Sequence, residues 1–345
     1  MLTNFFYILV AVLMLGIIIL VHELGHFLVA KLCKVQVEEF AVGMGMKLFS
    51  REHKGVLYSL RAIPIGGFCR FAQDIDSPSD SLSAAPIRKR FPILIAGVFM
   101  NFALAFLCAV IMLYMYTVAD VLPQVDTVLN DSPAQIAQLQ VGDIITEVNS
   151  IPISYNYEGV ALLRDTLAEA DSVTLTVRRG NTAQTVTLTP ELVTDEVTGQ
   201  SAKQIGIYFK TRTCTLPEAL RYGGIYMWDT TKDMLQTLKN LFFKGEGMES
   251  VTGPVGTISL VSEIVRSDSR MFLQLLFLIS LNLGIVNLLP LPGLDGGRLV
   301  FLLAEAIRRK PVPPDKEGMV HAVGMLLLLL LAVLLTWHDI VNIIL

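Results

Sequence analysis

Residues 21–27 read Val-His-Glu-Leu-Gly-His-Phe and place two imidazoles and a carboxylate inside an otherwise apolar run. Residues 5–21 contain no charged side chain and residues 28–30 stay apolar, so the segment predicts a membrane-spanning helix. Residues four apart share one face of a helix, so His22 and His26 would project side by side, with Glu23 next to them. Ionisable groups in hydrocarbon are costly and usually mark a function. We therefore expect a functional site within this first helix.

Two neutral imidazoles at this spacing suit a zinc ion, Zn2+. A third ligand must come from elsewhere in the chain, and the open position would hold a water whose pKa falls from about 15.7 to about 7. Glu23 is then placed to take the proton of that water. In a soluble helix the same short pattern often arises by chance, so the apolar surroundings are what favour catalysis here.

The composition indicates a polytopic membrane protein. Of 345 residues, 53% are hydrophobic and 17% charged, and the mean hydropathy is +0.57. The net charge of -4 and the lack of a basic stripe with interleaved aromatics argue against nucleic acid as a partner. The first run lacks the basic n-region and cleavage site of a signal peptide, so we expect it to be retained. Cys33, seven residues after His26, is either a further ligand or, more simply, a small apolar filler.

Three further spans are expected over residues 91–114, 271–289 and 319–337, which makes four crossings. Lys and Arg gather between the first and second spans and between the third and fourth, whereas both chain ends lack them. By the positive-inside rule both termini face out and the basic connections face the cytoplasm. The rise from Phe5 to His22 is about 25 Å of a hydrocarbon core of about 30 Å. The histidines would thus lie just beneath the cytoplasmic surface.

Residues 35–71 alternate apolar and polar side chains around a turn-like segment at residues 53–55, and Pro-Ile-Gly-Gly-Phe at residues 64–68 ends the pattern. This predicts β-hairpins that lean into the membrane beside the histidines, with an edge that can pair with an extended peptide. The alternative is a short sheet in a soluble cytosolic loop. Residues 77–85 are expected to be a polar linker. Asn101, within the second span, would either hydrogen-bond a neighbouring helix or orient a zinc ligand.

The hydropathy drops from Asp120 to about Lys210, which predicts a compact domain outside the membrane. Strands are expected at residues 121–129, 144–148, 173–177, 186–188 and 205–209, and helices at residues 133–139 and 156–170. Ser132-Pro133-Ala134, residues 139–145 and Val148-Asn149 resemble the signature of a bacterial PDZ domain, which implies binding of extended peptides or chain ends. Residues 216–243 have apolar side chains at mixed helical spacing and predict an interfacial amphipathic helix.

Asp295 is the expected third ligand. The third span would rise about 28 Å and deliver Asp295 to the depth of the two histidines. Pro290 and Pro292 stop that helix, and the glycines at 296 and 297 allow the backbone to approach a metal closely. Asp295 is alternatively the N-cap of a following helix, and the two roles can coexist.

Taken together, these motifs resemble the bacterial site-2 proteases, intramembrane zinc metalloproteases of the regulator-of-sigma-E-protease type, over nearly the whole chain. The resemblance implies that His22, His26 and Asp295 ligate zinc and that Glu23 is the general base. It also implies that Asn282 and Asn287 engage the substrate strand. Two departures stand out: the chain has room for one PDZ domain rather than two in tandem, and Gly97-Val98 stands where the family has Gly-Pro.

The implied fold is a polytopic α-helical membrane protein with four transmembrane helices, a membrane-associated β-hairpin region and one extracytoplasmic PDZ domain. The expected segments are residues 1–34 (first transmembrane helix), 35–75 (hairpin region), 76–90 (cytoplasmic linker), 91–117 (second transmembrane helix), 118–212 (PDZ domain), 213–268 (amphipathic segment), 269–311 (third transmembrane helix with the Leu-Asp-Gly-Gly motif) and 312–345 (fourth transmembrane helix).

The implied activity is regulated intramembrane proteolysis in the bacterial cytoplasmic (inner) membrane. The partners would be the lipid bilayer and a single-pass membrane protein whose ectodomain has already been trimmed, either an anti-sigma factor or a signal-peptide remnant. Both termini and the PDZ domain would be extracytoplasmic, and the active site would lie near the cytoplasmic face.

Two rival functions remain. A CAAX-type or stress-induced membrane metalloprotease also uses two histidines at this spacing, but it needs a Glu ligand on a later helix and leaves Asp295 unexplained. A PDZ-bearing membrane scaffold or transporter would carry these polar residues incidentally. Stoichiometric zinc that is lost when His22 or Asp295 is changed separates this last function from either protease.

Overall fold

The computed structural model describes residues 2–71, 82, 85–115, 117–119, 123–153, 157–194, 201–245, 253–268 and 271–344. The chain divides into two compact units, one of Met1–Ala109 with Gly224–Leu345 and the other of Val110–Gly223. Most of the expected linker at residues 77–85, the start of the strand expected at residue 121 and the first residue of the helix expected at Asn156 lie outside the described residues.

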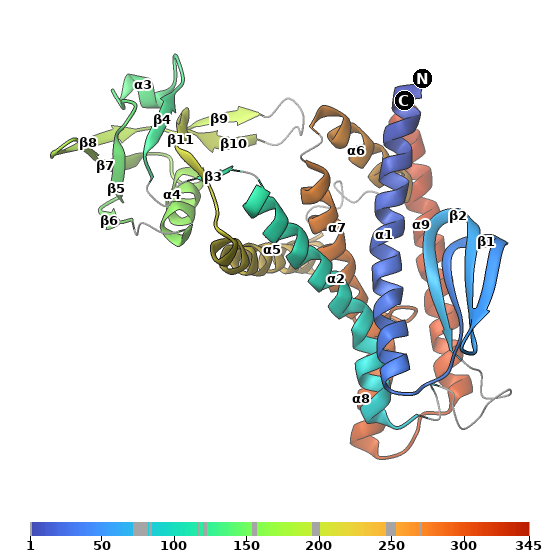
Figure 1. Ribbon diagram of the computed structural model, residues 1–345. Helices are drawn as coiled ribbons and strands as arrows, with labels where there is room; N and C mark the ends of the chain where they lie inside the picture. Colours follow the sequence, from blue (N-terminus) through green and yellow to red (C-terminus); the bar gives the residue numbers. More distant parts are fainter. Residues whose placement is uncertain are drawn as a thin grey trace. The chain divides into compact units, whose positions relative to one another are not determined.

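Four helices in the described part of the chain are long and apolar enough to cross a membrane, as predicted. They are α1 (Leu2–Leu32), α2 (Ile87–Met115), α7 (Met271–Leu288) and α9 (Pro314–Ile344) (Figure 1). Helix α7 ends before Pro290, because a proline ring is incompatible with a continuing helix. The four predicted spans are therefore confirmed as helices that are long and apolar enough to cross a membrane.

Small residues bring α1 and α2 together in the first unit. A Cβ on Gly25 of α1 would lie only 2.3 Å from the carbonyl oxygen of Ala96 in α2. Where lipid tails are as apolar as the side chains, close backbone packing of this kind is a main source of helix association. Further along, Met14 and Ile18 of α1 are buried with Phe277 and Leu281 of α7 in one apolar cluster. The contact at Gly25 sets the spacing of the two helices beside His26.

The predicted hairpin is present as β1 (Val37–His53) and β2 (Val56–Phe71). Lys54 and Gly55 form its turn with φ of 51° and 73°, as a two-residue turn with positive φ at both positions requires. Residues 39–42 pair both with residues 67–70 and with residues 57–60, so this part of β1 lies between two segments of β2. Residues 67–71 form one edge of the resulting sheet.

Strand β2 runs along α1 (Figure 1). A Cβ on Gly16 of α1 would lie 2.5 Å from the carbonyl oxygen of Pro64, and further along α1 the backbone N–H of Cys69 donates to Glu23. Both contacts fall within the candidate span Phe6–Leu32. This places the strand against the spanning part of α1, which favours a hairpin at membrane depth over a sheet in a soluble loop.

The second unit is built on a sheet of order β6-β5-β7-β8. Its elements are β3 (Thr117–Ala119), β4 (Val125–Val128), α3 (Pro133–Ile136), β5 (Ile144–Val148), β6 (Ile151–Pro152), α4 (Tyr157–Glu169), β7 (Val173–Arg179), β8 (Thr182–Leu188), β9 (Glu191–Thr194), β10 (Ser201–Gln204), β11 (Ile207–Phe209) and β12 (Thr211–Thr213). Ser132 caps α3 by accepting the N–H of Gln135, as its sequence predicts. The pairs β9–β10 and β3–β12 were not predicted, because these short segments lack a clear alternation.

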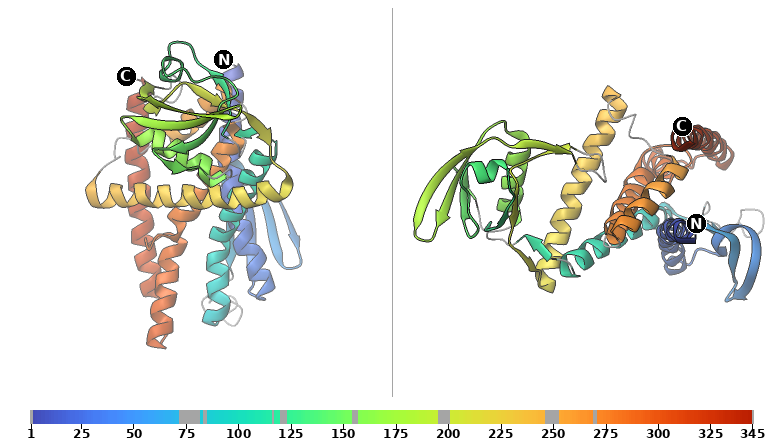
Figure 2. Two further views of the ribbon diagram at one scale, coloured as in Figure 1. Left: turned by 90° about the vertical axis from the view of Figure 1, so that its left-hand side faces the viewer. Right: turned by 90° about the horizontal axis from the view of Figure 1, so that it is seen from above.

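The expected amphipathic segment is one continuous helix, α5 (Leu216–Lys244), which is not a candidate span (Figure 2). A second helix follows, α6 (Pro254–Ser267), where only a break had been expected. Its N-terminus is satisfied by Asp339 of α9, which accepts the N–H groups of Gly253 and Gly256 at 3.0 and 2.8 Å. This cap is distant in sequence, and so local sequence patterns do not show where α6 begins.

Candidate metal centre

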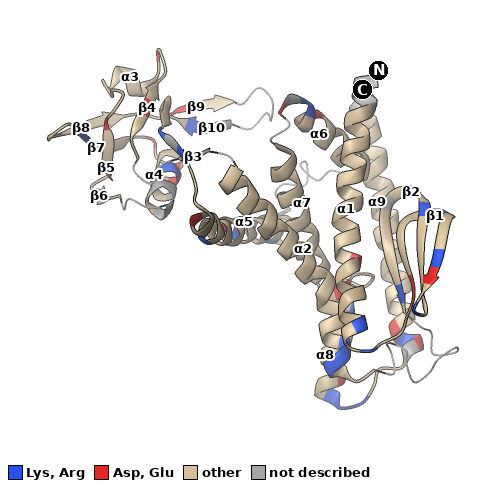
Figure 3. Ribbon diagram, in the orientation of Figure 1, with Lys and Arg blue, Asp and Glu red and all other residues tan. Residues whose placement is uncertain are grey.

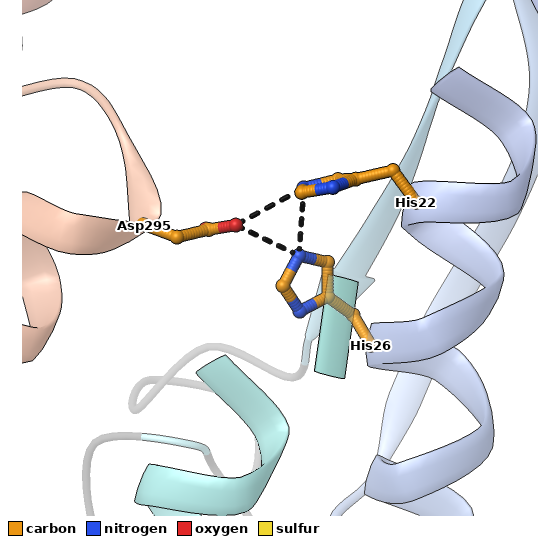
Figure 4. Close-up of side chains that lie close together, drawn as sticks. All are labelled: His22, His26 and Asp295. Atoms are coloured by element: carbon orange, nitrogen blue, oxygen red, sulfur yellow. Dashed lines mark hydrogen bonds and ion pairs between the residues drawn. The ribbon is translucent and has the colours of Figure 1, made fainter. Parts of the chain in front are cut away.

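Three polar side chains from opposite ends of the chain meet within the first unit (Figure 4). Oδ2 of Asp295 lies 3.0 Å from Nε2 of His22 and 3.2 Å from Nε2 of His26. The two Nε2 atoms are themselves 3.2 Å apart. Both imidazoles are buried and the Asp295 side chain is 17% exposed. Three potential ligand atoms thus point at one centre.

The turn after α7 brings Asp295 into this position. Residues 289–294 form a turn after α7, and α8 (Asp295–Arg308) starts directly afterwards. A Cβ on Gly296 would lie 2.2 Å from the carbonyl oxygen of Leu289, and one on Gly297 would lie 2.4 Å from that of Leu291. Only glycine permits so tight a turn. The N-cap of α8 is Leu294, so Asp295 is the first helical residue, and its carboxylate points at the two histidines instead of capping the helix.

The residues fit a zinc ion. Oδ2 of Asp295 is buried and accepts no conventional hydrogen bond within the described part of the chain. A Cβ on Gly97 of α2 would lie 2.4 Å from Nε2 of His26 and 2.8 Å from Nε2 of His22, so glycine keeps the space beside both nitrogens free. Two imidazoles and one carboxylate form the donor set of a catalytic zinc with an open position.

Helix α2 orients both imidazoles. Nδ1 of His26 donates to the carbonyl oxygen of Ile93 at 2.7 Å, which leaves the Nε2 lone pair for a metal. The Asn101 amide lies 3.2 Å from Nδ1 of His22, and its Oδ1 has no partner among the described residues. With Oδ1 turned to Nδ1–H, the amide oxygen gains a partner and Nε2 of His22 keeps its lone pair; the two ends of an amide are assigned by such networks.

Asn101 therefore contacts a candidate ligand through its side chain. The backbone carbonyl oxygen of Asn101 accepts a hydrogen bond from the hydroxyl of Ser280 in α7 at 2.9 Å, so the same residue also contacts a neighbouring helix. Both roles weighed for this lone polar residue are compatible with its contacts. A lone asparagine inside an apolar span is a sequence signal for Asn101, whereas Gly97 and the Ile93 carbonyl have none.

Glu23 is half-buried next to the two histidines on α1, and its Oε2 accepts the backbone N–H of Cys69 at 3.0 Å. The β2 edge thus lies beside this carboxylate. On α7, Asn282 is exposed and Asn287 is half-buried in the last turn. Cys33 packs in an apolar cluster with Ala30 and Val35 and is not part of the ligand group found in the described residues.

Comparison with known proteins gives the same class. The model of peptidase family M50 matches residues 10–331. A candidate zinc metalloprotease of Clostridium acetobutylicum is 34% identical over 98% of each chain. The zinc metalloprotease RasP of Oceanobacillus iheyensis is 28% identical over 95% of this chain and 97% of its own. The regulator of sigma-W protease RasP of Bacillus subtilis is 27% identical over the same shares of the two chains.

The structure and these matches define a zinc metalloprotease with helices that can span a membrane. The chain belongs to peptidase family M50, the site-2 proteases. A solved PDZ domain of an SdrC-like protein from Listeria innocua aligns with 26% of this chain and 92% of its own, at 22% identity and a TM-score of 0.21.

Proposed function

We propose that this membrane zinc metalloprotease cleaves a peptide bond inside the bilayer, in a single-pass membrane protein whose ectodomain has already been shortened. The observation that carries the proposal is the convergence of His22, His26 and Asp295 on one centre, with the histidines in the candidate span of α1. Hydrolysis at that depth needs a water molecule made reactive where lipid would otherwise exclude it.

In this proposal His22, His26 and Asp295 hold the zinc. When bound, zinc acts as a Lewis acid that polarises a peptide carbonyl and makes water acidic near neutral pH. Glu23 is the general base: its carboxylate takes a proton from the attacking water and then, as the acid, returns it to the leaving amine. Asn101 and the Ile93 carbonyl hold the two imidazoles in the tautomer that leaves each Nε2 unprotonated.

A substrate helix must be unwound before cleavage, because each backbone amide in it is protected by its own hydrogen bond. The β2 edge at residues 67–71 offers replacement bonds, since residues 39–42 cover its other side and Glu23 lies beside Cys69. An extended peptide added to this edge would run past the general base. Asn282 and Asn287 of α7 are proposed to engage the same peptide, one being exposed and the other half-buried near the turn that precedes Asp295.

The second unit is proposed to be a PDZ domain, covering residues 118–212, that receives or filters substrates by strand addition. Its support is the helix cap at Ser132 and the turn at Asn149, which follow the signature noted in the sequence. The same proposal includes the other segment boundaries expected from the sequence, from the first helix at residues 1–34 to the last at residues 312–345. The segment at residues 213–268 contains two helices, α5 and α6.

Charge placement supports the proposed orientation in a bacterial cytoplasmic membrane. Figure 3 shows basic residues gathered where α1 ends, α2 begins and α8 lies. Lys31, Arg88 and Arg308 belong to these parts of the three helices. By the positive-inside rule this end faces the cytoplasm, so the metal centre lies near that face and both termini are outside. The name of the Bacillus subtilis relative, a regulator of sigma-W protease, supports an anti-sigma factor as substrate; a signal-peptide remnant is the other candidate.

The test is cleavage of a tagged single-pass protein by the full chain in proteoliposomes, with zinc content measured on the same samples. Glu23→Gln should keep zinc and lose cleavage, whereas His22→Ala and Asp295→Ala should lose both. His53→Ala removes an exposed imidazole at the hairpin turn and is the matched control. Cleavage by Glu23→Gln at the wild-type rate would reject the assigned base, and stoichiometric zinc in Asp295→Ala would reject the ligand set.

A further inference from the structure

The turn that precedes Asp295 is contacted by a side chain from the last helix. The backbone N–H of Gly293 donates to Nδ1 of His321 in α9 at 2.9 Å. Gly293 has a φ of +96°, a conformation that favours glycine. Its N–H therefore points away from the local helix ladders and finds its acceptor 28 residues further along the chain.

Neighbouring residues of α9 contact the same turn. A Cβ on Gly324 would lie 2.3 Å from Cβ of Pro292, and a Cβ on Gly293 would lie 3.2 Å from the backbone nitrogen of Met325 and from Cδ1 of Leu328. Residues 321, 324, 325 and 328 are spaced as one face of a helix. One stripe of α9 therefore lies directly on residues 292–293, next to the candidate ligand.

This contact is specific rather than part of extensive packing. Most of α9 is exposed in the structure, including Leu326 and Leu329. Its other long-range polar contacts within the described residues include Asp339, which caps α6, and Glu317, whose carboxylate lies 3.9 Å from the Arg90 guanidinium of α2. A ligand must be held close to its productive geometry by the residues around it. We propose that His321 is a positioning residue for the third metal ligand: by accepting the Gly293 N–H, it fixes the turn that presents Asp295. The inference rests on the proposed role of Asp295.

The chemistry of the imidazole suggests a sharp test. Nδ1 can accept the Gly293 N–H only when it carries no proton of its own, so the neutral ring has its proton on Nε2. Nε2 is buried and has no hydrogen-bond partner among the described residues. The ring of His321 also lies 5.6 Å from the ring of Phe301 in α8, centroid to centroid, so the test must separate the Nδ1 acceptor from ring packing. Asn carries an oxygen acceptor on the same Cγ, and Leu has the same branching without any acceptor, so the two substitutions form a matched pair.

The experiment uses the full chain purified in detergent, as wild type, His321→Asn, His321→Leu and a control at an exposed position of α9, Leu329→Ala. Zinc release to a chelator is timed, and the visible absorption of the cobalt-substituted protein is recorded as a signature of ligand geometry. We expect His321→Leu to release zinc about tenfold faster, by analogy with lost outer-shell contacts, and to change the cobalt bands. His321→Asn should stay within about twofold of the wild type.

The inference is overturned if His321→Leu matches the wild type in both measurements, or if His321→Asn is as impaired as His321→Leu. Metal-free samples should unfold at similar temperatures, which separates positioning from a general loss of stability. If His321→Leu does not accumulate, His321→Gln replaces it, because its amide oxygen lies one bond further from the backbone. Wild-type protein without stoichiometric zinc, or Asp295→Ala with it, would instead refute the proposed function.

Discussion

The Asn101 amide of α2 lies 3.2 Å from Nδ1 of His22 in α1 and is completely buried. A buried amide at this distance decides which nitrogen of the imidazole carries the proton, and therefore whether Nε2 can bind a metal.

Replacing Asn101 tests that relationship. Asn101→Leu removes the acceptor at nearly the same shape, so we expect zinc affinity to fall about 10- to 100-fold. Asn101→Asp keeps an acceptor for Nδ1–H and should retain most of the affinity. Competition with a chelator of known affinity measures both. Equal affinities for wild type and Asn101→Leu would show that His22 takes its tautomer without help from α2.

Gly97 is expected to be essential for metal binding because a methyl group there would occupy the space beside both Nε2 atoms. Gly97→Ala should fold and lose most of its zinc and its cleavage activity. Gly284→Ala in α7 is the matched control, since its Cβ would meet Phe102 at an ordinary 3.5 Å. Zinc content by atomic emission distinguishes the two variants. Full zinc occupancy in Gly97→Ala would place the ion elsewhere.

Glu39 should be required for the integrity of the hairpin. Its buried carboxylate accepts from Ser59 at 2.6 Å and from Arg61 and Arg70 at 2.8 Å. Glu39→Ala leaves two guanidinium groups without this partner, which costs about 3–5 kcal/mol for a fully buried pair and less here, where Arg70 is half exposed. Faster hydrogen exchange across residues 37–71, with zinc retained, is the expected result. Unchanged exchange would mean that the strands hold their register without the ion pairs.

Asp143 makes the stability of the second unit depend on pH. Burial alone would raise the pKa of its carboxyl, but hydrogen bonds from Arg179 and from the Gln140 N–H lower it below its usual value overall. The pKa of the Asp143 carboxyl is lower in the folded state than in the unfolded state. The ionised carboxylate therefore stabilises the unit at pH values above the unfolded-state pKa, and this stabilisation is lost as the pH falls through the folded-state pKa.

The corresponding substitution is Asp143→Asn, which should destabilise the unit by about 1–3 kcal/mol near neutral pH. The stability of this variant should also fall less steeply than that of the wild type as the solution is made acidic. Protease protection of residues 123–209 in the full chain, followed against pH and denaturant, measures this. An equal loss of stability at low pH in both proteins would assign the effect to other carboxylates.

The sequence alone determined the four spans, the hairpin, the amphipathic helix and the residues of the metal centre as candidates. Long apolar runs can only be satisfied as helices in lipid, alternation identifies strands, and two histidines four apart share a face wherever a helix forms. These are local rules, and α1, α7 and β1–β2 follow them. The expected depth of Asp295 likewise followed from the rise of one helix.

Only the tertiary structure decided which atoms support that centre. The Ile93 carbonyl, the space left by Gly97 and the His321 contact to Gly293 each join segments far apart in the chain. Helix α6 is similar, because its N-terminus is capped by Asp339 from α9. Backbone carbonyls and absent side chains leave no pattern in a sequence, since any residue supplies a carbonyl and most glycines serve turns. Their roles arise only when packing brings specific groups within hydrogen-bond distance.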